Sequence, residues 1–444
     1  MSFSLPYLRG RRYLRGIDWV VGSLHEAGRA TVGVGAVSQA IFELDGKLAD
    51  QSLRAALDQV SRRFPLIHGH FSRDYFNLAP YWKVPRSARA ASIPLRVVDL
   101  PADADDPADR LLAEHVNTPF ESDSIHIRFL LVRIGDRRSK LGLVFDHRLF
   151  DAFGAETFFR LLEEAFQDRL DDVAPRVAIT EPAHLDHWKR RFLAGQTLNR
   201  LLIELQKEDV CALAMPTPTQ GRQVKFVHAS LTVEQTAQLN MTVSKEINVP
   251  IILPSMAARA VAAVEHVIPR PALPGSQWLL FTSANMRSAG QEWESMFFNH
   301  FSFLLFSAPF AAGKSIRDLA MLLRDQLFQA MKEKIPSAME DAAALGRIFP
   351  RSLVAKVINS TFKARMSSFY FACVKETGFA GATFMGLPVT NIVHTPLAFA
   401  PPGLNLCMTF FGGRFNIVLS YLDGAIEDRE AAEIVERFRS SLVA

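Results

Sequence analysis

One histidine and one aspartate stand at a spacing that suits acid–base chemistry. His147 follows the apolar segment Leu141–Phe145, and Asp151 comes four residues later. A hydroxyl or an amine is a weak nucleophile at neutral pH and needs a base whose pKa lies near that pH, for which histidine is the usual choice. An imidazole works as a base only in the right tautomer and orientation, which a second group normally holds. The pair is therefore our candidate for a catalytic centre.

The surroundings of His147 favour this interpretation over the structural role that a lone histidine more often has. Residues 125–145 alternate apolar and other side chains around a polar turn at 135–140, which predicts a β-hairpin. A phenylalanine-rich helix is expected to begin near Ala155. The His147 segment would then be a loop between a strand and a helix, where a rigid frame commonly holds exposed catalytic groups.

The rest of the chain alternates between predicted strands and predicted helices. Helices are expected at residues 49–64, 233–243, 251–266 and 316–334. Strands are expected at residues 30–45, 66–71, 81–84, 224–231, 278–283, 301–306, 369–374 and 389–393. We expect an acidic loop or short helix at 102–109, and a hairpin at 404–421 that turns at Gly412-Gly413. The two halves thus have a similar order of elements, without a repeat of sequence.

The length and composition are those of a two-domain globular protein. Because 444 residues exceed one ordinary core, we expect an N-terminal subdomain at 1–180, a connecting helix and linker at 181–221, and a C-terminal subdomain at 222–444. The sequence holds 34 Phe but only 6 Tyr and 5 Trp. This excess predicts a phenylalanine-packed core and favours a lipid-like or aromatic substrate.

The charge pattern argues against nucleic-acid binding. The formal net charge is +4, and no long run of Lys or Arg occurs. We interpret the basic cluster at 8–15 as a solvated tail, with a site for an anionic surface as the alternative. The basic amphipathic segment 188–193 is interpreted as a helix at the domain joint, with peripheral contact to a membrane as the alternative.

Cysteine usage and hydropathy indicate a cytoplasmic protein. Three cysteines, Cys211, Cys373 and Cys407, do not form a disulfide framework, and none has the spacing of a metal ligand. We interpret them as small buried hydrophobic side chains. The N-terminus lacks the layout of a signal peptide, and no apolar stretch approaches the ~20 residues of a membrane-spanning helix.

Residues 125–166 resemble the central region of the chloramphenicol acetyltransferase-like superfamily. That group includes condensation domains of nonribosomal peptide synthetases, wax ester synthases, polyketide-associated acyltransferases and plant BAHD acyltransferases. Its signature is His-His-x-x-x-Asp-Gly, or His-x-x-x-Asp in some branches, and this chain matches the shorter form. Three flanking segments extend the resemblance over most of the chain: 53–66, Ser283–Arg287 and Asn299–Phe301.

The resemblance implies an α/β fold of two similar sheet-plus-helix lobes, set in a V around a central tunnel. A thioester donor, coenzyme A or phosphopantetheine on an acyl carrier protein, would enter from one face and the acceptor from the other. His147 would take the proton from the acceptor, and Asp151 would act structurally through an ion pair with Arg287. No metal or permanently bound cofactor is implied, and a monomer is expected.

Two positions depart from the longer signature. Asp146 replaces the first histidine, and a carboxylate there is expected to raise the pKa of His147. Ala152 replaces the glycine, and its methyl group is expected to narrow the tunnel or to exclude a positive φ. These departures leave open a divergent subfamily, or a non-catalytic protein that binds an acyl or pantetheine ligand or a carrier protein. A separate alternative is a thioester or ester hydrolase that uses water activated at His147, although no Gly-x-Ser-x-Gly elbow occurs.

Further side chains are candidates for contacts in the site. Donors for an oxyanion are expected from Asn285, Asn299 and Ser368. Tunnel-lining positions are expected for Trp278 and His300, and Gly154 is expected to keep the motif loop tight. Asp146 itself is a further candidate for substrate contact.

Overall fold

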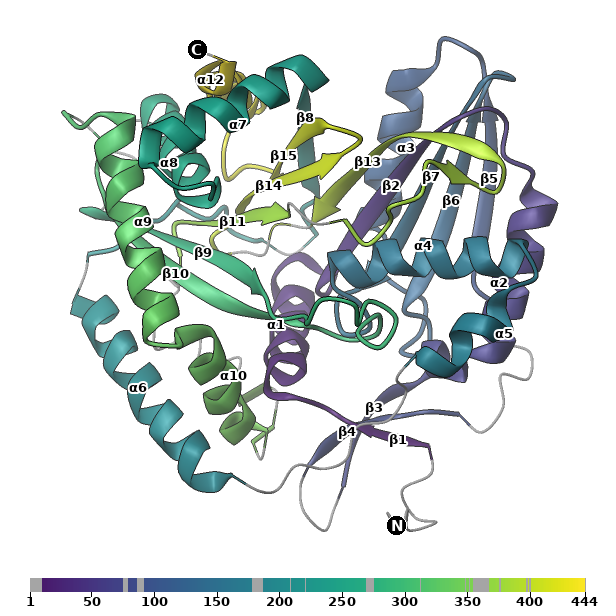
Figure 1. Cartoon of the computed structure of the whole chain (residues 1–444), viewed down its shortest axis with the longest axis horizontal. Coiled ribbons are helices and arrows are strands. Elements are labelled where there is room, and N and C mark those ends of the chain that lie inside the picture. Colours follow the sequence, from purple (N-terminus) through teal and green to yellow (C-terminus); the bar gives the residue numbers. More distant parts are fainter. Residues whose placement is uncertain are drawn as a thin grey trace.

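The computed structural model describes residues 10–443 apart from 75–78, 86–91, 178–186, 208, 220, 269–274, 312, 348, 351, 354–366, 375–376, 397 and 399–400. Two six-stranded sheets form the frames of two lobes (Figure 1). The first has the order β12 (Thr383–Phe384), β13 (Leu387–Pro396), β2 (Val37–Asp45), β7 (Arg138–Asp146), β6 (Ile127–Ile134), β5 (Leu95–Leu100). The second has the order β10 (Phe301–Pro309), β9 (Gln277–Asn285), β11 (Phe369–Val374), β14 (Leu404–Phe411), β15 (Arg414–Leu422), β8 (Val224–Leu231). A small sheet of β1 (Arg11–Tyr13), β4 (Pro80–Lys83) and β3 (His70–Arg73) adjoins the first lobe.

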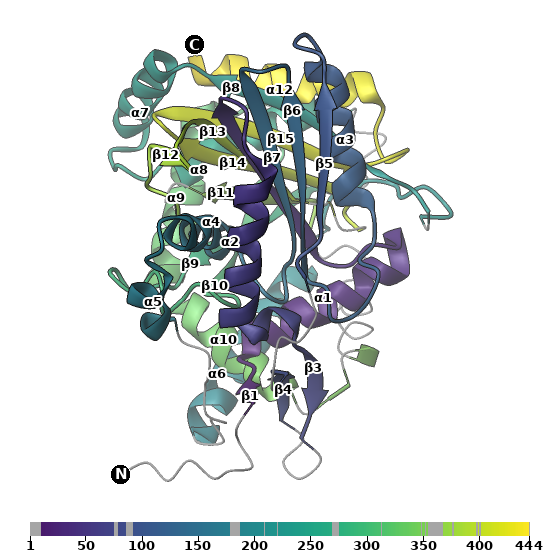
Figure 2. The same cartoon turned by 90° about the vertical axis from the view of Figure 1, so that its right-hand side faces the viewer.

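Helices cover both faces of the first sheet. On one face lie α2 (Asp50–Arg63) and α4 (Ala152–Phe166), and on the other lies α3 (Asp105–Asn117) (Figure 2). Helix α2 turns Leu53, Ala56, Leu57 and Val60 inward, each at most 2% exposed, because apolar residues three and four apart share one helix face. The core between these helices and the sheet is rich in phenylalanine, as the composition predicted.

The second sheet is covered by four helices, which are α7 (Val233–Ile247), α8 (Leu253–Val267), α9 (Ile316–Lys332) and α12 (Asp428–Val443). They share one apolar core with the sheet. Its alanine-rich contributor is α8, which buries the small side chains Ala257, Ala258 and Ala260. Small side chains let this helix approach the sheet closely. The core of the second lobe is separate from the phenylalanine-rich core of the first.

Three further helices are α1 (Gly16–Val32), α6 (Trp188–Lys207) and α10 (Ile335–Gly346). Helix α10 packs against both α1 and α6, and α6 lies at the outer edge of the molecule on the side of the second lobe (Figure 1), so the segment 188–193 is helical as predicted but does not lie between the two sheets. The remaining short elements are α5 (Leu170–Val173) and 3-10 helices at Pro65–His68 and Ala174–Arg176. Within the described ranges, no helix is both long and apolar enough to cross a membrane.

The chain crosses between lobes once more near its C-terminal end. Strands β12 and β13 belong to the sequence range 222–444, yet they complete the first sheet, where β13 pairs with β2. The connecting range 181–221 contains α6 and the Pro/Thr/Gly stretch, although residues 181–186, 208 and 220 lie outside the described residues. The two lobes are therefore joined by strand exchange as well as by a linker.

Both predicted hairpins are confirmed, as β6–β7 and β14–β15. Two local predictions were wrong. Residues 30–36 are not strand, because α1 runs to Val32 and ends at Gly33, whose φ of 80° suits a glycine in a left-handed helix cap. Residues 66–68 lie in a 3-10 helix that begins at Pro65. The acidic segment 102–109, predicted as a loop or a short helix, contains the first turns of the longer helix α3 from Asp105 onward. Acidic side chains in a first turn favour the positive end of the helix dipole.

Candidate active site

His147 lies at the end of β7, and its backbone and side chain are both held. Its N–H donates to the carbonyl of Ala36 at 2.8 Å, and its Nδ1 lies 3.2 Å from Oδ1 of Asn299. Nδ2 of Asn299 donates to the His147 carbonyl at 2.9 Å and to Asp18 at 3.3 Å, so Oδ1 is the acceptor that faces the imidazole. The neutral ring must then carry its hydrogen on Nδ1, which leaves a lone pair on Nε2.

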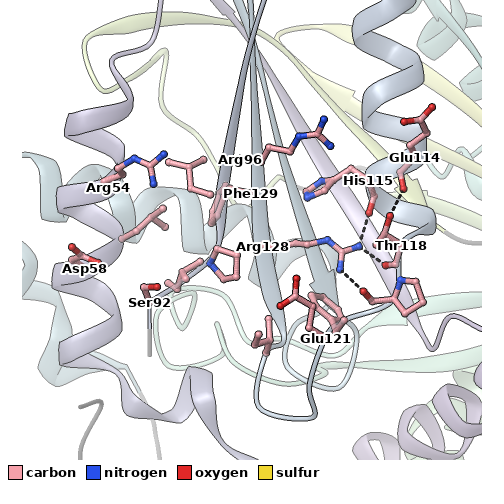
Figure 3. Close-up of a pocket in the computed structure, with 17 residues that line it drawn as sticks. Arg54, Asp58, Ser92, Arg96, Glu114, His115, Thr118, Glu121, Arg128 and Phe129 are labelled. Atoms are coloured by element: carbon pink, nitrogen blue, oxygen red, sulfur yellow. Dashed lines mark hydrogen bonds between the residues drawn. The ribbon is translucent and has the colours of Figure 1, made fainter. Parts of the chain in front are cut away.

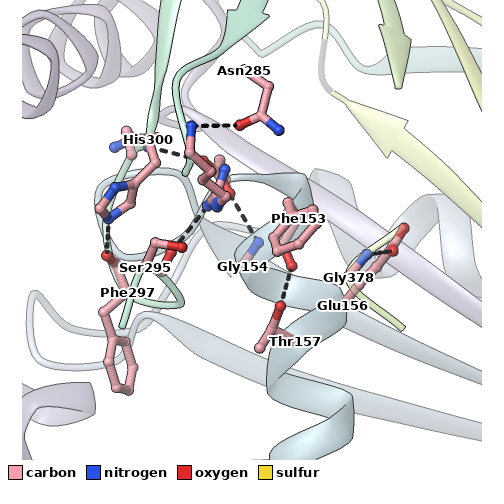
Figure 4. Close-up of polar contacts among 12 residues, drawn as sticks. Phe153, Gly154, Glu156, Thr157, Asn285, Ser295, Phe297, His300 and Gly378 are labelled. Atoms are coloured by element: carbon pink, nitrogen blue, oxygen red, sulfur yellow. Dashed lines mark hydrogen bonds and ion pairs between the residues drawn. The ribbon is translucent and has the colours of Figure 1, made fainter. Parts of the chain in front are cut away.

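Asp151 ties three elements together at the start of α4. Its Oδ1 caps the helix by accepting from the N–H of Gly154 at 2.9 Å and also accepts from Arg287 at 2.6 Å. Its Oδ2 accepts from the N–H of His300 at 3.0 Å (Figure 4). The expected ion pair with Arg287 therefore spans the two lobes. These bonds place Asp151 as a positioning residue beside His147.

Gly154 is required where α4 meets the second lobe. A Cβ at this position would lie 2.2 Å from the carbonyl oxygen of Met296, which is too close for two non-bonded atoms, so the backbone of α4 or of the Met296 segment would have to shift. The glycine thus allows the first turn of α4 to press against the segment that leads to Asn299. Its role is close approach rather than contact with a substrate.

The electrostatics favour a neutral His147 and an ionised Asp151. Burial lowers the pKa of His147 below its ordinary value and outweighs the opposing effects of Asp151, the Asn299 hydrogen bond and Asp146. Burial alone would raise the pKa of Asp151, but Arg287 and the N–H of His300 hold it below the ordinary value. As expected, Asp146 acts to raise the pKa of His147, but desolvation of the imidazolium is the larger effect and the net pKa is lowered.

Buried neutral histidines predict that the protein loses stability in mild acid. Burial lowers the pKa of His115 and of His300 to about 3, from the ordinary histidine pKa of 6.5 that applies to the unfolded chain. As pH falls below about 6.5 the unfolded state takes up protons that the folded state refuses, so the unfolding free energy should fall steadily. Denaturant titrations at about pH 7, 6 and 5 would measure this slope. A constant unfolding free energy would contradict the prediction, since the lowered carboxylate pKa values act only at more acid pH.

A cavity of about 380 Å³ lies between the lobes and contains His147 in its wall. Strands of both sheets, the start of α4 and α1 contribute to the wall. Phenylalanine and tyrosine side chains line much of it: Phe153, Phe281, Phe301, Phe303, Tyr370 and Phe371. Asp151, Arg287 and Asn285 also border this cavity, so the motif and its ion pair face the same space. The space is suited to an apolar or aromatic ligand with its reactive group at His147.

A larger hollow of about 740 Å³ lies at the edge of the first lobe, along α2, β5 and the end of α3 (Figure 3). Its most buried cation, Arg128, donates to the carbonyls of His115 at 2.5 Å, Pro119 at 3.2 Å and Thr118. The guanidinium thus caps the C-terminal end of α3, where carbonyls lack helical partners. No residue predicted to belong to the site borders this hollow, which leaves the central cavity as the candidate site.

Several predicted contacts lie elsewhere. Asp146 is fully buried and points away from the cavity into a cluster with Arg148 at 2.5 Å and His126 at 3.1 Å, so it does not contact a substrate. The indole of Trp278 donates to Glu265 within the second core. The hydroxyl of Ser368 accepts from the N–H of Leu279 in the sheet.

Two other predictions are corrected by the same geometry. Asn299 and His300 stand behind His147 and Asp151 rather than in the cavity wall, so Asn299 orients the imidazole instead of stabilising an oxyanion. Asn285 does border the cavity, and its Oδ1 accepts from the N–H of Arg287 at 3.1 Å. Ala152 opens α4 without a positive φ, so its methyl group fits the helical backbone.

The N-terminal segment contributes to the site in a way that the sequence did not reveal. Residue 9 and those before it lie outside the described residues, but Arg12 is 2% exposed and its guanidinium lies 3.4 Å from the ring centre of Phe298. Arg15 donates to the carbonyl of Asn299, and the N–H of Asn299 donates to the carboxylate of Asp18 at 3.1 Å. The interpretation as a solvated tail was wrong for these arginines, because the buried carboxylate of Asp18 gives them a partner.

The thiol of Cys407 offers no alternative nucleophile. Cys373 and Cys407 border the cavity, and burial raises the pKa of Cys407 to about 12. A thiol is nucleophilic as the thiolate, which is scarce at neutral pH when the pKa is so high. Within the described part of the chain, no three His, Cys, Asp or Glu side chains are grouped to hold a metal ion.

The comparisons with known proteins identify the fold. The chain superimposes on the first condensation domain of the CDA synthetase with a TM-score of 0.65 at 14% identity, covering 98% of this chain and 95% of that one. It superimposes on the trichothecene 15-O-acetyltransferase TRI3 from Fusarium sporotrichioides with a TM-score of 0.67 at 12% identity, covering 98% and 95%. It superimposes on the protein SgcC5 from Streptomyces globisporus with a TM-score of 0.64 at 14% identity, covering 97% of this chain and 97% of that one.

The chain has the chloramphenicol acetyltransferase-like fold. The expected architecture of two sheet-plus-helix lobes is therefore confirmed. No family model matches the chain, and no curated protein matches it either. Similarity at these identities establishes the fold alone, so the chemistry of this acetyltransferase-like fold has to be argued from the site.

Proposed function

We propose that this protein transfers an acyl group from a thioester to a hydroxyl or an amine, with His147 as the general base. The observation that carries the proposal is the contact between Nδ1 of His147 and Oδ1 of Asn299 at 3.2 Å, in the wall of the central cavity. It fixes the tautomer in which Nε2 is free to accept a proton. The lowered pKa of His147 keeps that lone pair available at neutral pH.

In the proposed reaction the acceptor attacks the thioester carbonyl carbon. Nε2 of His147 takes the proton from the attacking oxygen or nitrogen as the new C–O or C–N bond forms. The tetrahedral intermediate then collapses, the C–S bond breaks, and the proton passes from His147 to the departing thiolate. Asp151 takes no proton, because Arg287 and two backbone N–H groups stabilise its charged form.

The donor is proposed to be coenzyme A or the phosphopantetheine of an acyl carrier protein, bound as a co-substrate by a monomeric enzyme. Two of the superimposed structures are those of a condensation domain and of a 15-O-acetyltransferase, which supports this reaction class. The aromatic wall of the cavity supports an acceptor that is lipid-like or aromatic, as in the biosynthesis of lipids or secondary metabolites.

The two departures from the longer signature do not favour the non-catalytic alternative. Asp146 is paired with Arg148 in a buried cluster, and Ala152 occupies a helical position without strain. The hydrolase alternative needs water in place of the acceptor at Nε2 of His147. The cavity wall is mostly apolar, which favours an organic acceptor over water.

The function is tested by measuring thiol release from a panel of acyl-coenzyme A donors, with and without alcohols and amines. Release that depends on an acceptor, with the ester or amide detected by mass spectrometry, is the expected result. Release at equal rates without an acceptor would identify a hydrolase. Binding of the donor without any release, including from a carrier-protein thioester, would identify a binding protein and overturn the proposal.

A further inference from the structure

A second histidine–carboxylate pair borders the central cavity. His394 on β13 and Glu156 on α4 are each 3% exposed, and Nε2 of His394 lies 2.7 Å from Oε1 of Glu156. The pair joins strand β13, which crosses from the second half of the chain, to the helix that Asp151 caps. It is separate from the contacts of His147.

The surroundings of Glu156 determine which nitrogen of His394 carries the hydrogen. The other carboxylate oxygen accepts from the N–H groups of Gly378 at 2.6 Å and Phe379 at 3.3 Å, and from the hydroxyl of Thr377 (Figure 4 shows the Gly378 contact). Every described partner of Glu156 is thus a donor. Nε2–H of His394 donates to it as well, so the neutral ring has its lone pair on Nδ1.

That lone pair has no partner among the described residues. Nδ1 of His394 is buried and unpaired, and so is Oδ1 of Asn405 on β14, which is 7% exposed. Both residues border the same cavity. Buried polar atoms in folded proteins nearly always have a hydrogen-bond partner, and exceptions point to a ligand or to function.

The strand register places His394 away from His147. Asp146 pairs with Val37 across β7 and β2, and Ala40, three residues further along β2, pairs with His394. His147 lies one residue beyond Asp146, so two strand spacings and four residue steps separate the backbones of His147 and His394 by about 15 Å. Nδ1 of His394 therefore lies too far away to take part in the proton transfer.

We propose that His394 and Asn405 form a recognition subsite for a hydroxyl or N–H group carried by the substrate about 15 Å from its reacting end. The proposal rests on the proposed function only in assigning that reacting end to His147. It defines the substrate class as an elongated apolar molecule with a second hydrogen-bond donor. Glu156 is the positioning residue, since it acts through His394.

The test uses linear α,ω-alkanediols whose hydroxyls lie about 15 Å apart, each compared with the 1-alkanol of the same length. Calorimetric titration of the wild-type protein should show about tenfold tighter binding of the diol, the worth of one hydrogen bond to a buried group. His394→Phe and Asn405→Leu should bring the ratio of the two dissociation constants close to one. His266→Phe, at an exposed histidine late in α8, is the matched control and should keep the preference.

Equal affinity for diol and alkanol in the wild-type protein would overturn the proposal, and so would a preference that survives in both cavity variants. Asn405→Leu keeps the test decisive if His394→Phe does not fold, because the Asn405 side chain has no described hydrogen bond to lose. His147→Ala should keep the preference for the diol while losing acyl transfer. A failure of the proposed reaction is thereby distinguished from a failure of the subsite.

Discussion

Replacing His147 by alanine should lower kcat/KM for acyl transfer by about 100- to 10,000-fold, the range that general-base catalysis contributes. The loss follows from the absence of Nε2, the lone pair that the Asn299 contact keeps facing the substrate. The measurement is acceptor-dependent thiol release at saturating donor. Unchanged turnover would show that another group takes the proton.

Asn299→Ala provides the positioning counterpart of this experiment. It leaves Nε2 in the protein but removes the acceptor that selects the tautomer, so kcat should fall while binding of the donor persists. Its pH profile is the informative readout, because loss of the Asn299 contact removes an interaction that raises the pKa of His147. The acid limb of the profile should then move to lower pH. Substitution of the exposed His266 by alanine should change neither quantity.

Asp151→Asn should lower the unfolding free energy by about 3 kcal/mol and reduce turnover as well. Removing one partner of a buried ion pair leaves the other charge uncompensated, and here that charge is Arg287. Asparagine still offers an oxygen to the N–H of Gly154, so the helix cap is kept, but its Nδ2 faces the N–H of His300 and that hydrogen bond is lost together with the charge. Chemical denaturation and initial rates measure the two effects. Normal stability together with normal activity would remove the structural role of Asp151.

A double-mutant cycle separates the ion pair from other consequences of the change. Arg287→Met combined with Asp151→Asn should destabilise the protein by less than the sum of the single changes, since neither charge is then left alone. Glu164→Gln, which breaks the exposed pair with Arg169, is a control that should change stability far less. Additive losses would indicate that the two side chains act independently.

Local patterns in the sequence predicted the frame around His147. The hairpin of β6 and β7 followed from alternating side chains, and α4 followed from apolar residues at helical spacing. His147 was predicted at the strand end and Asp151 in the loop before the helix, but α4 begins at Ala152, three residues earlier than predicted, so Asp151 caps it. Prediction failed where two local signals competed, as at the end of α1, where β-branched residues near Val32 suggest a strand but the helix continues to Gly33.

The sequence by itself determined the strand and helix periods, the Phe-rich core and the identity of the candidate base, because each depends on residues close together in the chain. The tertiary structure decided what holds that base. Asn299 reaches His147 across 152 positions, and His394 reaches Glu156 across 238. Such contacts form only when β13 pairs with β2 in the first sheet and Asn299 of the second lobe binds Asp18. Burial then makes an unpaired charge or lone pair at these positions energetically costly. Composition and local spacing do not predict which strands, far apart in the sequence, pair in the fold.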